Sequence, residues 1–166
     1  MGIRDRDAGV MAWVGLVQAH SGLVDALSHD LQMRHGLPLT WLEVLIKLSD
    51  SQEGKMRMQD LAKEAWLSKS GITRLVDRME EADLVGRAAC ATDRRVTYAT
   101  ITDKGRRTLE ATIPDHIASI DRLFSAHLTT AEIAALRQTM QKVLRGLGLE
   151  PEENCATELI EEEASA

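Results

Sequence analysis

An amphipathic segment from Ser68 to Asp83 places the strongest constraint on how this chain folds. Its apolar residues recur with the spacing of an α-helix, so one face of that helix is expected to be buried. Ser68 stands just before the pattern and is a good N-cap, because its hydroxyl can accept a hydrogen bond from a free amide of the first turn. The four apolar positions are Ile72, Leu75, Val76 and Met79.

The opposite face of this helix is basic and rich in hydroxyl groups. Lysine and arginine can contact phosphates or guanine edges, and serine and threonine can bond to phosphate oxygens or bases. The face therefore suits a helix that enters the major groove of DNA, although an ordinary solvated helix face has the same composition. Its members are Lys69, Ser70, Thr73, Arg74, Asp77 and Arg78, with Ser68 at the start.

Short elements flank the helix on both sides. Residues 61–67 hold enough apolar side chains for a first, shorter helix and a tight turn. Downstream, Leu84-Val85 and residues 96–101 are typical of two strands, since the second run alternates and is rich in β-branched residues. The polar segment 90–95 lies between them. This order of elements predicts a winged helix-turn-helix.

Adjacent arginines occupy the tip of the predicted hairpin. Arg94 and Arg95 are suited to a minor groove, where the potential of DNA is most negative. Asp93 precedes them and can orient one guanidinium through a charge-assisted hydrogen bond.

Together these motifs resemble the MarR family of bacterial transcription regulators. The resemblance rests on L-A, S-x-S-x-x-T-R-L-V-D-R-M-E, L-V, D-R-R and I-T-D-K-G, and it spans roughly Leu39 to Leu147. It implies that Ser68 to Arg78 is the major-groove helix. It also implies that Asp93 and Arg95 form the Asp-x-Arg wing motif of the family, and that Thr102 to Gly105 opens a helix leading to a dimer interface.

Two positions depart from the pattern of the family. Met58 stands where a serine or threonine helix cap is common, so the first motif helix is expected to begin less firmly. Asp83 stands where glycine is usual, and aspartate tolerates a left-handed turn less well than glycine does. Neither departure removes a side chain expected to contact DNA.

The distribution of charge is compatible with a nucleic-acid partner even though the chain has a net charge of −6. Residues 55–107 hold 12 basic and 8 acidic side chains, a local charge of +4, so the remainder carries −10. Because non-specific DNA affinity is mainly electrostatic, the acidic remainder is expected to keep that affinity low. The segment 149–166 is acidic and is interpreted as a disordered or loosely docked tail.

Residues 8–35 are predicted to form one long helix, ended by Gly36 and Pro38. A heptad-like apolar stripe follows its length, and His20 is the only polar member. A second helix is expected from Thr40, which has capping-box spacing with Glu43. The stripe consists of Val10, Trp13, Val17, His20, Val24, Leu27 and Leu31.

Residues 103–148 are predicted to be helical, with a kink or break at Pro114 and a second capping box at Thr129 and Glu132. Both ends of the chain carry more apolar surface than a small DNA-binding lobe can cover. A two-fold homodimer is the economical solution, and it predicts a pseudo-palindromic operator on double-stranded DNA. The dimerisation candidates are Val10, Val17, Ile113, Ile117, Ile120, Phe124, Leu136, Met140, Val143 and Leu147.

The resemblance also implies a small-molecule effector, because ligands of the family often bind where the dimerisation helices meet the DNA-binding lobe. The candidate residues are Trp13, His20, Trp41 and Trp66. A hydrogen-bonded core or interface role is the more common one for such a histidine, and packing is the more common role for the tryptophans.

Catalysis, cofactors and metals have little support in the sequence. Cys90 and Cys155 show no C-x-x-C spacing, although oxidation of Cys90 in the wing remains an alternative means of regulation. The chain has no phosphate-binding glycine loop and no hydrolase motif, so no enzyme activity and no cofactor are expected. The histidines lack the i, i+4 spacing of a helical metal site; they are His20, His29, His35, His116 and His127.

No membrane span is expected, because no apolar run approaches the roughly 18 residues that a span needs. The N-terminus also lacks the apolar core of a signal peptide, so a cytoplasmic protein is expected. A composition of 44% hydrophobic but 3% aromatic residues favours helical packing, and the fold class is mainly α with a small β-wing. We expect one domain over 1–148, with a DNA-binding lobe at 39–102 and dimerisation helices at 8–35 and 103–148.

The expected function is that of a homodimeric repressor that binds specific DNA sequences and is released by an effector. The alternative is a winged-helix module that binds another protein.

Overall fold

The structure, a computed structural model, describes residues 8–89 and 96–149. The expected wing-tip residues Asp93, Arg94 and Arg95, the two cysteines and the acidic tail therefore lie outside the described residues. The chain divides into two compact units, residues 1–123 and 124–166, and each is treated by itself.

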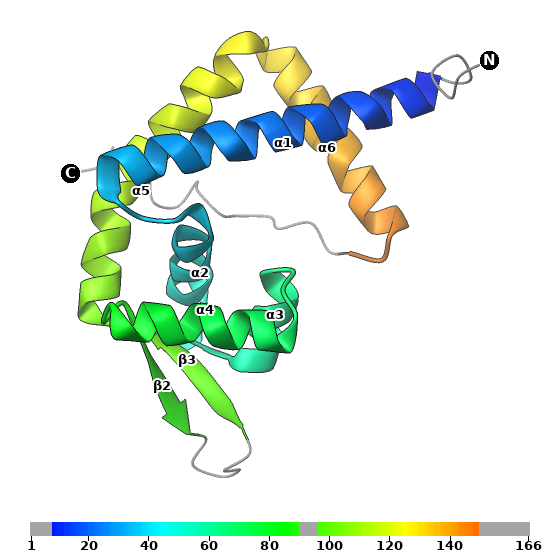
Figure 1. Cartoon of the computed structure of the whole chain (residues 1–166). Helices are drawn as coiled ribbons and strands as arrows, with labels where there is room; N and C mark the ends of the chain where they lie inside the picture. The colour runs from blue at the N-terminus through cyan, green and yellow to red at the C-terminus, as the bar shows by residue number, and fades with distance from the viewer. Residues whose placement is uncertain (1–7, 90–95, 150–166) are drawn as a thin grey trace. The chain divides into compact units, whose positions relative to one another are not determined.

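The first unit contains five helices and three strands among its described residues (Figure 1). The order confirms the predicted winged helix-turn-helix, with a long helix before it and another after it. The elements are α1 (Ala8–His35), α2 (Leu39–Asp50), β1 (Lys55–Arg57), α3 (Met58–Glu64), α4 (Lys69–Glu81), β2 (Val85–Ala89), β3 (Thr97–Ile101) and α5 (Asp103–Leu123), with a short 3-10 turn at Gln52–Gly54.

The core of this unit forms where α2, α3 and α4 pack over the sheet. The apolar stripe of α4 faces inward as its spacing predicted, and none of its four members is more than 5% exposed. Leu42, Leu45 and Leu48 of α2 are fully buried against the same cluster. This shared core fixes α4 against the rest of the unit and leaves Lys69, Arg74 and Arg78 exposed.

The sheet has a strand that the sequence analysis did not predict. Its order is β1-β3-β2, and all pairs are antiparallel. In Figure 1, β2 and β3 extend from beneath α4 as a hairpin. The unexpected strand is β1, which at three residues is too short to show a periodic pattern. Pairing with β3 creates it, with Met56 opposite Ala99.

The predicted helix caps have mixed outcomes. The Ser68 hydroxyl accepts a hydrogen bond from the Gly71 amide at 3.0 Å, which confirms the N-cap of α4. The expected cap at Thr40 is wrong, because the N-cap of α2 lies two residues earlier, at Pro38, and has no side-chain cap. The Pro38 carbonyl accepts from the Trp41 amide at 2.9 Å, so Thr40 lies inside the first turn.

Hydrogen bonds connect the start of α5 to the turn that follows α4. Asp83 adopts the left-handed conformation that its position demands, with φ 60°. The Thr102 hydroxyl donates to the Asp83 carbonyl at 2.8 Å and accepts from the Gly105 amide at 2.9 Å. A Cβ on Gly105 would lie 2.1 Å from the Leu84 carbonyl oxygen, so only glycine fits there. The I-T-D-K-G motif is therefore a joint between the two helices.

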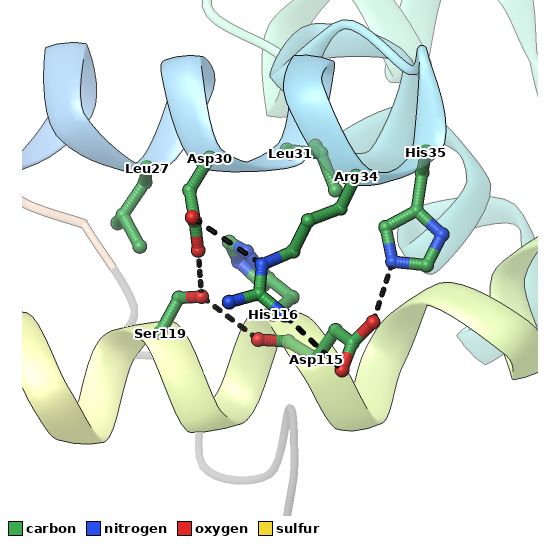
Figure 2. Close-up of a pocket in the computed structure, with 8 residues that line it drawn as sticks. All are labelled: Leu27, Asp30, Leu31, Arg34, His35, Asp115, His116 and Ser119. Carbon is green, nitrogen blue, oxygen red and sulfur yellow. Dashed lines mark hydrogen bonds and ion pairs between the residues drawn. The ribbon is translucent and has the colours of Figure 1, made fainter.

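α1 and α5 pack side by side, and polar groups connect them (Figure 2). Ser119 of α5 donates to the Asp30 carboxylate of α1, and Arg122 reaches the same carboxylate at 3.1 Å. His35 lies 2.9 Å from Asp115. Pro114 lies within α5 without ending it, so the break considered in the sequence analysis does not occur.

The second unit contains a 3-10 turn at Ser125–His127 and α6 (Thr130–Gly146) among its described residues. The capping box predicted at Thr129 and Glu132 is confirmed, with the Thr129 amide donating to the Glu132 carboxylate at 2.8 Å. This bond lowers the pKa of Glu132 below its ordinary value. No residue of α6 is buried within the chain.

Candidate DNA-binding surface

The exposed face of α4 carries the side chains that the sequence predicted for DNA contact. Core packing on one face and the Ser68 cap at the start together determine which side chains point outward. Ser68, Lys69, Ser70, Thr73, Arg74 and Arg78 are all exposed. The described part of the candidate surface is thus a single helix face with three cationic groups.

Several of these side chains already have partners within α4. The Ser68 hydroxyl caps the helix, and the Thr73 hydroxyl donates to the Lys69 carbonyl at 2.8 Å. Arg78 donates to the Arg74 carbonyl at 3.4 Å. The Ser68 hydroxyl and the other N–H groups of Arg78 can still donate to a phosphate, whereas the single hydroxyl hydrogen of Thr73 is already used within the helix.

The N-terminal turn of α4 is electrostatically suited to anions. It contains no acidic residue, and Lys69 adds a full positive charge to the partial charge of the helix N-terminus. Ser70 lies beside the cap, with its hydroxyl 3.1 Å from that of Ser68. A phosphate placed here would meet amide, hydroxyl and ammonium donors together.

A groove of about 480 Å³ separates this part of α4 from the hairpin. Its walls come from the end of β1, the beginning of α3, α4, β2 and the beginning of β3, so α4 and the strands of the wing line one continuous surface. The polar residues that line it include Arg57, Gln59, Lys69, Thr73, Arg87 and Thr97.

Sequence reasoning missed Arg87, which contacts α4 from strand β2. Its guanidinium lies 2.5 Å from carboxylate oxygens of both Asp77 and Glu80. No local pattern around Arg87 indicates these partners, because they lie on a different element 7 and 10 residues earlier. Asp77, assigned to the DNA-facing side from its spacing, is occupied by this contact.

The four effector candidates line neither the groove beside α4 nor the crevice between α1 and α5. Trp13 and His20 are exposed on α1, and Trp13 is 63% exposed. Trp41 is half-buried against the core. Trp66 lies in the turn before α4, 77% exposed and with a left-handed backbone, φ 54°. Their effector role stays a prediction.

The crevice between α1 and α5, drawn in Figure 2, lies where two helices meet but is filled by their own side chains. The hydrogen bond from Ser119 holds the pKa of Asp30 below its ordinary value, and Arg34 and Arg122 act in the same direction against the opposing effect of burial. Burial lowers the pKa of His116 on the opposite wall. These groups stabilise the packing of the two helices.

The dimerisation candidates are only partly covered within the chain. Val17 is 42% exposed, Val143 49% and Leu147 68%. Val10, Ile113, Ile117, Ile120, Phe124, Leu136 and Met140 are half-buried. Ile113 packs against the core of its own unit, so part of its apolar surface is already used.

Residues 8–89 and 96–149 contain no group of three or more histidine, cysteine, aspartate or glutamate side chains that could hold a metal ion. α1 is long and apolar enough to cross a membrane by length and composition, because its polar residues are mostly uncharged; the sequence analysis did not expect this. Core and interface helices of water-soluble proteins satisfy the same criteria.

Comparison with known proteins agrees with the winged helix-turn-helix architecture. Residues 35–96 match the MarR family model. The chain is 33% identical over 131 residues to the HTH-type transcriptional regulator MhqR of Bacillus subtilis (strain 168), which covers 79% of this chain and 88% of that protein.

Two solved structures from Streptomyces coelicolor are also similar. AbsC, a MarR family transcriptional regulator, is 34% identical with a TM-score of 0.79, over 86% of this chain and 95% of that chain. Sco3205, a MarR family regulator solved in complex with DNA, is 31% identical with a TM-score of 0.77, over 86% and 88%. These relatives are transcriptional regulators and not enzymes. The chain therefore belongs to the MarR family of transcriptional regulators.

Proposed function

We propose that this protein binds specific sequences of double-stranded DNA and regulates transcription from them. The observation that carries the proposal is the division of α4 into a fully buried apolar face and an exposed face bearing Lys69, Arg74 and Arg78. Base edges would be contacted mainly from the first two turns, by Lys69, Ser70, Thr73 and Arg74. Arg78 lies further along the helix and would contact phosphate.

The solved complex of Sco3205 with DNA supports a DNA-binding role, since that relative shares 31% identity over most of both chains. The proposed contribution of the wing is an arginine contact in the minor groove from Arg94 and Arg95, oriented by Asp93. These residues lie outside the described part of the chain, and the proposal for them rests on their sequence and on the hairpin that leads to them.

The proposed active form is a homodimer. Large apolar side chains of α1 and α6 are exposed in the single chain, which favours their burial against a second copy. A two-fold axis would present two α4 helices about one turn of DNA apart, so the operator is expected to be pseudo-palindromic. An apolar α1 covered in this way suits a cytoplasmic protein.

Repression, with release by a small molecule, is the mode of regulation that family membership supports. An effector that binds preferentially to a dimer with the wrong separation between its α4 helices would weaken operator binding by shifting the population toward that dimer. Trp13, His20, Trp41 and Trp66 remain the candidate contacts.

The test is fluorescence anisotropy with duplexes tiled across the DNA that flanks the gene of this protein, at two salt concentrations and against a scrambled duplex. We expect one tile to bind tightly, with the stoichiometry of a dimer, and to resist competition by the scrambled sequence. Weak binding to every tile that disappears at the higher salt concentration would argue against a local operator. Selection of bound fragments from the whole genome would then decide whether any specific site exists.

A further inference from the structure

Arg87 joins the strand that leads into the wing to the middle of α4. Its Nη2 donates to Asp77 Oδ1 at 2.5 Å and to the Thr73 carbonyl at 3.3 Å, and its Nη1 donates to Glu80 Oε2 at 2.5 Å. Three acceptors on two successive turns of one helix therefore converge on a single guanidinium. A lysine could not reproduce this arrangement, because it lacks the planar fork of donors.

The three charged side chains are partly shielded from solvent. Arg87 is 27% exposed, whereas Asp77 and Glu80 are 49% and 41% exposed. Surface ion pairs usually add little to stability, so stability alone does not account for two carboxylates in these positions. Both are negative charges on the helix whose exposed face is proposed to approach phosphates, which would weaken DNA binding unless they served another purpose.

The register of the sheet indicates that purpose. Arg87 pairs with Ala99 of β3, and the two strands continue together to the Ala89 and Thr97 pair, the last described before the wing tip. Fixing Arg87 against α4 therefore fixes the base of the hairpin against the helix. The backbone joins α4 to β2 only through the turn at Ala82–Leu84, at the end of β2 that is farther from the wing tip. This turn does not fix the orientation of the tip relative to α4.

We propose that Arg87 is a positioning residue for DNA recognition, with Asp77 and Glu80 as its anchors on α4. It holds the wing at the orientation in which helix and wing contact one duplex together, and it makes no phosphate contact of its own. This inference rests on the proposed DNA-binding function.

The charge of Asp77 provides the clearest test, because two explanations predict opposite signs. If the ion pair is incidental, Asp77→Asn removes a repulsive charge and DNA binding becomes tighter. If Asp77 anchors Arg87, Asp77→Asn weakens specific binding by about ten-fold, which corresponds to roughly 1.4 kcal/mol. Glu81→Gln is the matched control, because it removes the same charge from an exposed position on the same helix that has no ion pair with Arg87.

Arg87→Gln tests the other side of the contact and whether Arg87 binds phosphate directly. If Arg87 bound phosphate directly, Arg87→Gln would weaken binding but Asp77→Asn, which leaves the guanidinium in place, would not; if Arg87 positions the wing, both variants weaken binding. The double variant Arg87→Gln/Asp77→Asn is expected to be no weaker than either single variant, because both remove one interaction. Arg87→Lys should restore only part of the loss.

The experiment measures anisotropy of full-length protein on a duplex enriched from a random-sequence library by the wild-type chain, across a salt series. Thermal unfolding of every variant confirms that it is folded. If the wild type enriches no sequence, the proposed function fails. If the wild type binds but Asp77→Asn binds as tightly as Glu81→Gln, the positioning role is wrong while the proposed function stands.

Discussion

Helices α4 and α1 both carry regular apolar stripes, but the stripe of α4 is buried within the chain whereas that of α1 is mostly exposed. In α4 every apolar member of the stripe is buried by α2, α3 and the sheet. In α1 only Leu31 is buried, while Trp13, Val17 and Val24 are at least 37% exposed. The difference shows that apolar periodicity identifies the face of a helix that is suited to burial. It does not indicate whether the residues that bury this face belong to the same chain.

The contrast also explains why α1 satisfies the length and composition of a membrane span. A helix whose apolar face is covered by its own chain can remain polar on the other face, as α4 does. α1 combines exposed apolar residues with few charges, which a second copy of the chain would cover in a homodimer.

A matched pair of methionines measures the difference directly. Met79→Ala in α4 is expected to lower the free energy of unfolding by about 2–5 kcal/mol, because Met79 is fully buried and leaves a cavity. Met33→Ala in α1 should change it by less than about 0.5 kcal/mol, since Met33 is 72% exposed. Chemical denaturation of both variants provides the measurement. A similar loss in both would mean that Met33, which lies outside the apolar stripe of α1, is covered in the folded protein.

Val17→Asp tests whether a second copy covers α1. A buried unpaired carboxylate is strongly unfavourable, so we expect the dimer dissociation constant to rise by at least about ten-fold while each chain remains folded. Sedimentation equilibrium reports the association, and circular dichroism reports the fold. Gln18→Asp, an exposed neighbour outside the stripe, controls for the added charge. A dimer unaffected by Val17→Asp would place the interface elsewhere.

Asp83→Gly addresses the end of α4, where the chain turns with φ 60°. Glycine adopts this conformation without the steric penalty of a Cβ, so we expect a gain of about 0.5–1 kcal/mol in the free energy of unfolding. The neighbouring hydrogen bond from Thr102 uses the Asp83 carbonyl and would remain. Thermal unfolding measures the shift. A loss of stability would indicate that the carboxylate stabilises the turn.

The smallest expected effect concerns pH and the packing of α1 on α5. Burial lowers the pKa of His116, so the unfolded chain takes up a proton more readily than the folded chain does. The contribution of neutral His116 to the free energy of unfolding is complete above the ordinary histidine pKa of about 6.5, and it is lost as the pH falls below that value. His116→Gln should therefore weaken the fall in melting temperature between pH 7.5 and pH 5.5.

The nearby groups Asp30, Arg34 and His35 are present in both proteins, so the difference between wild type and His116→Gln isolates His116. Identical pH profiles would show that His116 is protonated equally in the folded and unfolded chains.

The sequence alone determined the local features of this protein. The register of α4, the Ser68 cap, the length of α1 and the Thr129 capping box were all predicted, because each depends on residues within about four positions of one another. The exposed residues of α4 that are proposed to contact DNA followed from the same periodicity. The family resemblance, carried by I-T-D-K-G and the motif around Ser68, was also present in the sequence.

Only the tertiary structure decided which distant residues meet. β1 exists because β3 pairs with it, and Arg87 is a functional candidate because folding brings it against Asp77 and Glu80. Periodicity and capping are short-range effects, whereas strand pairing and ion pairs between elements depend on three-dimensional proximity that no local pattern encodes.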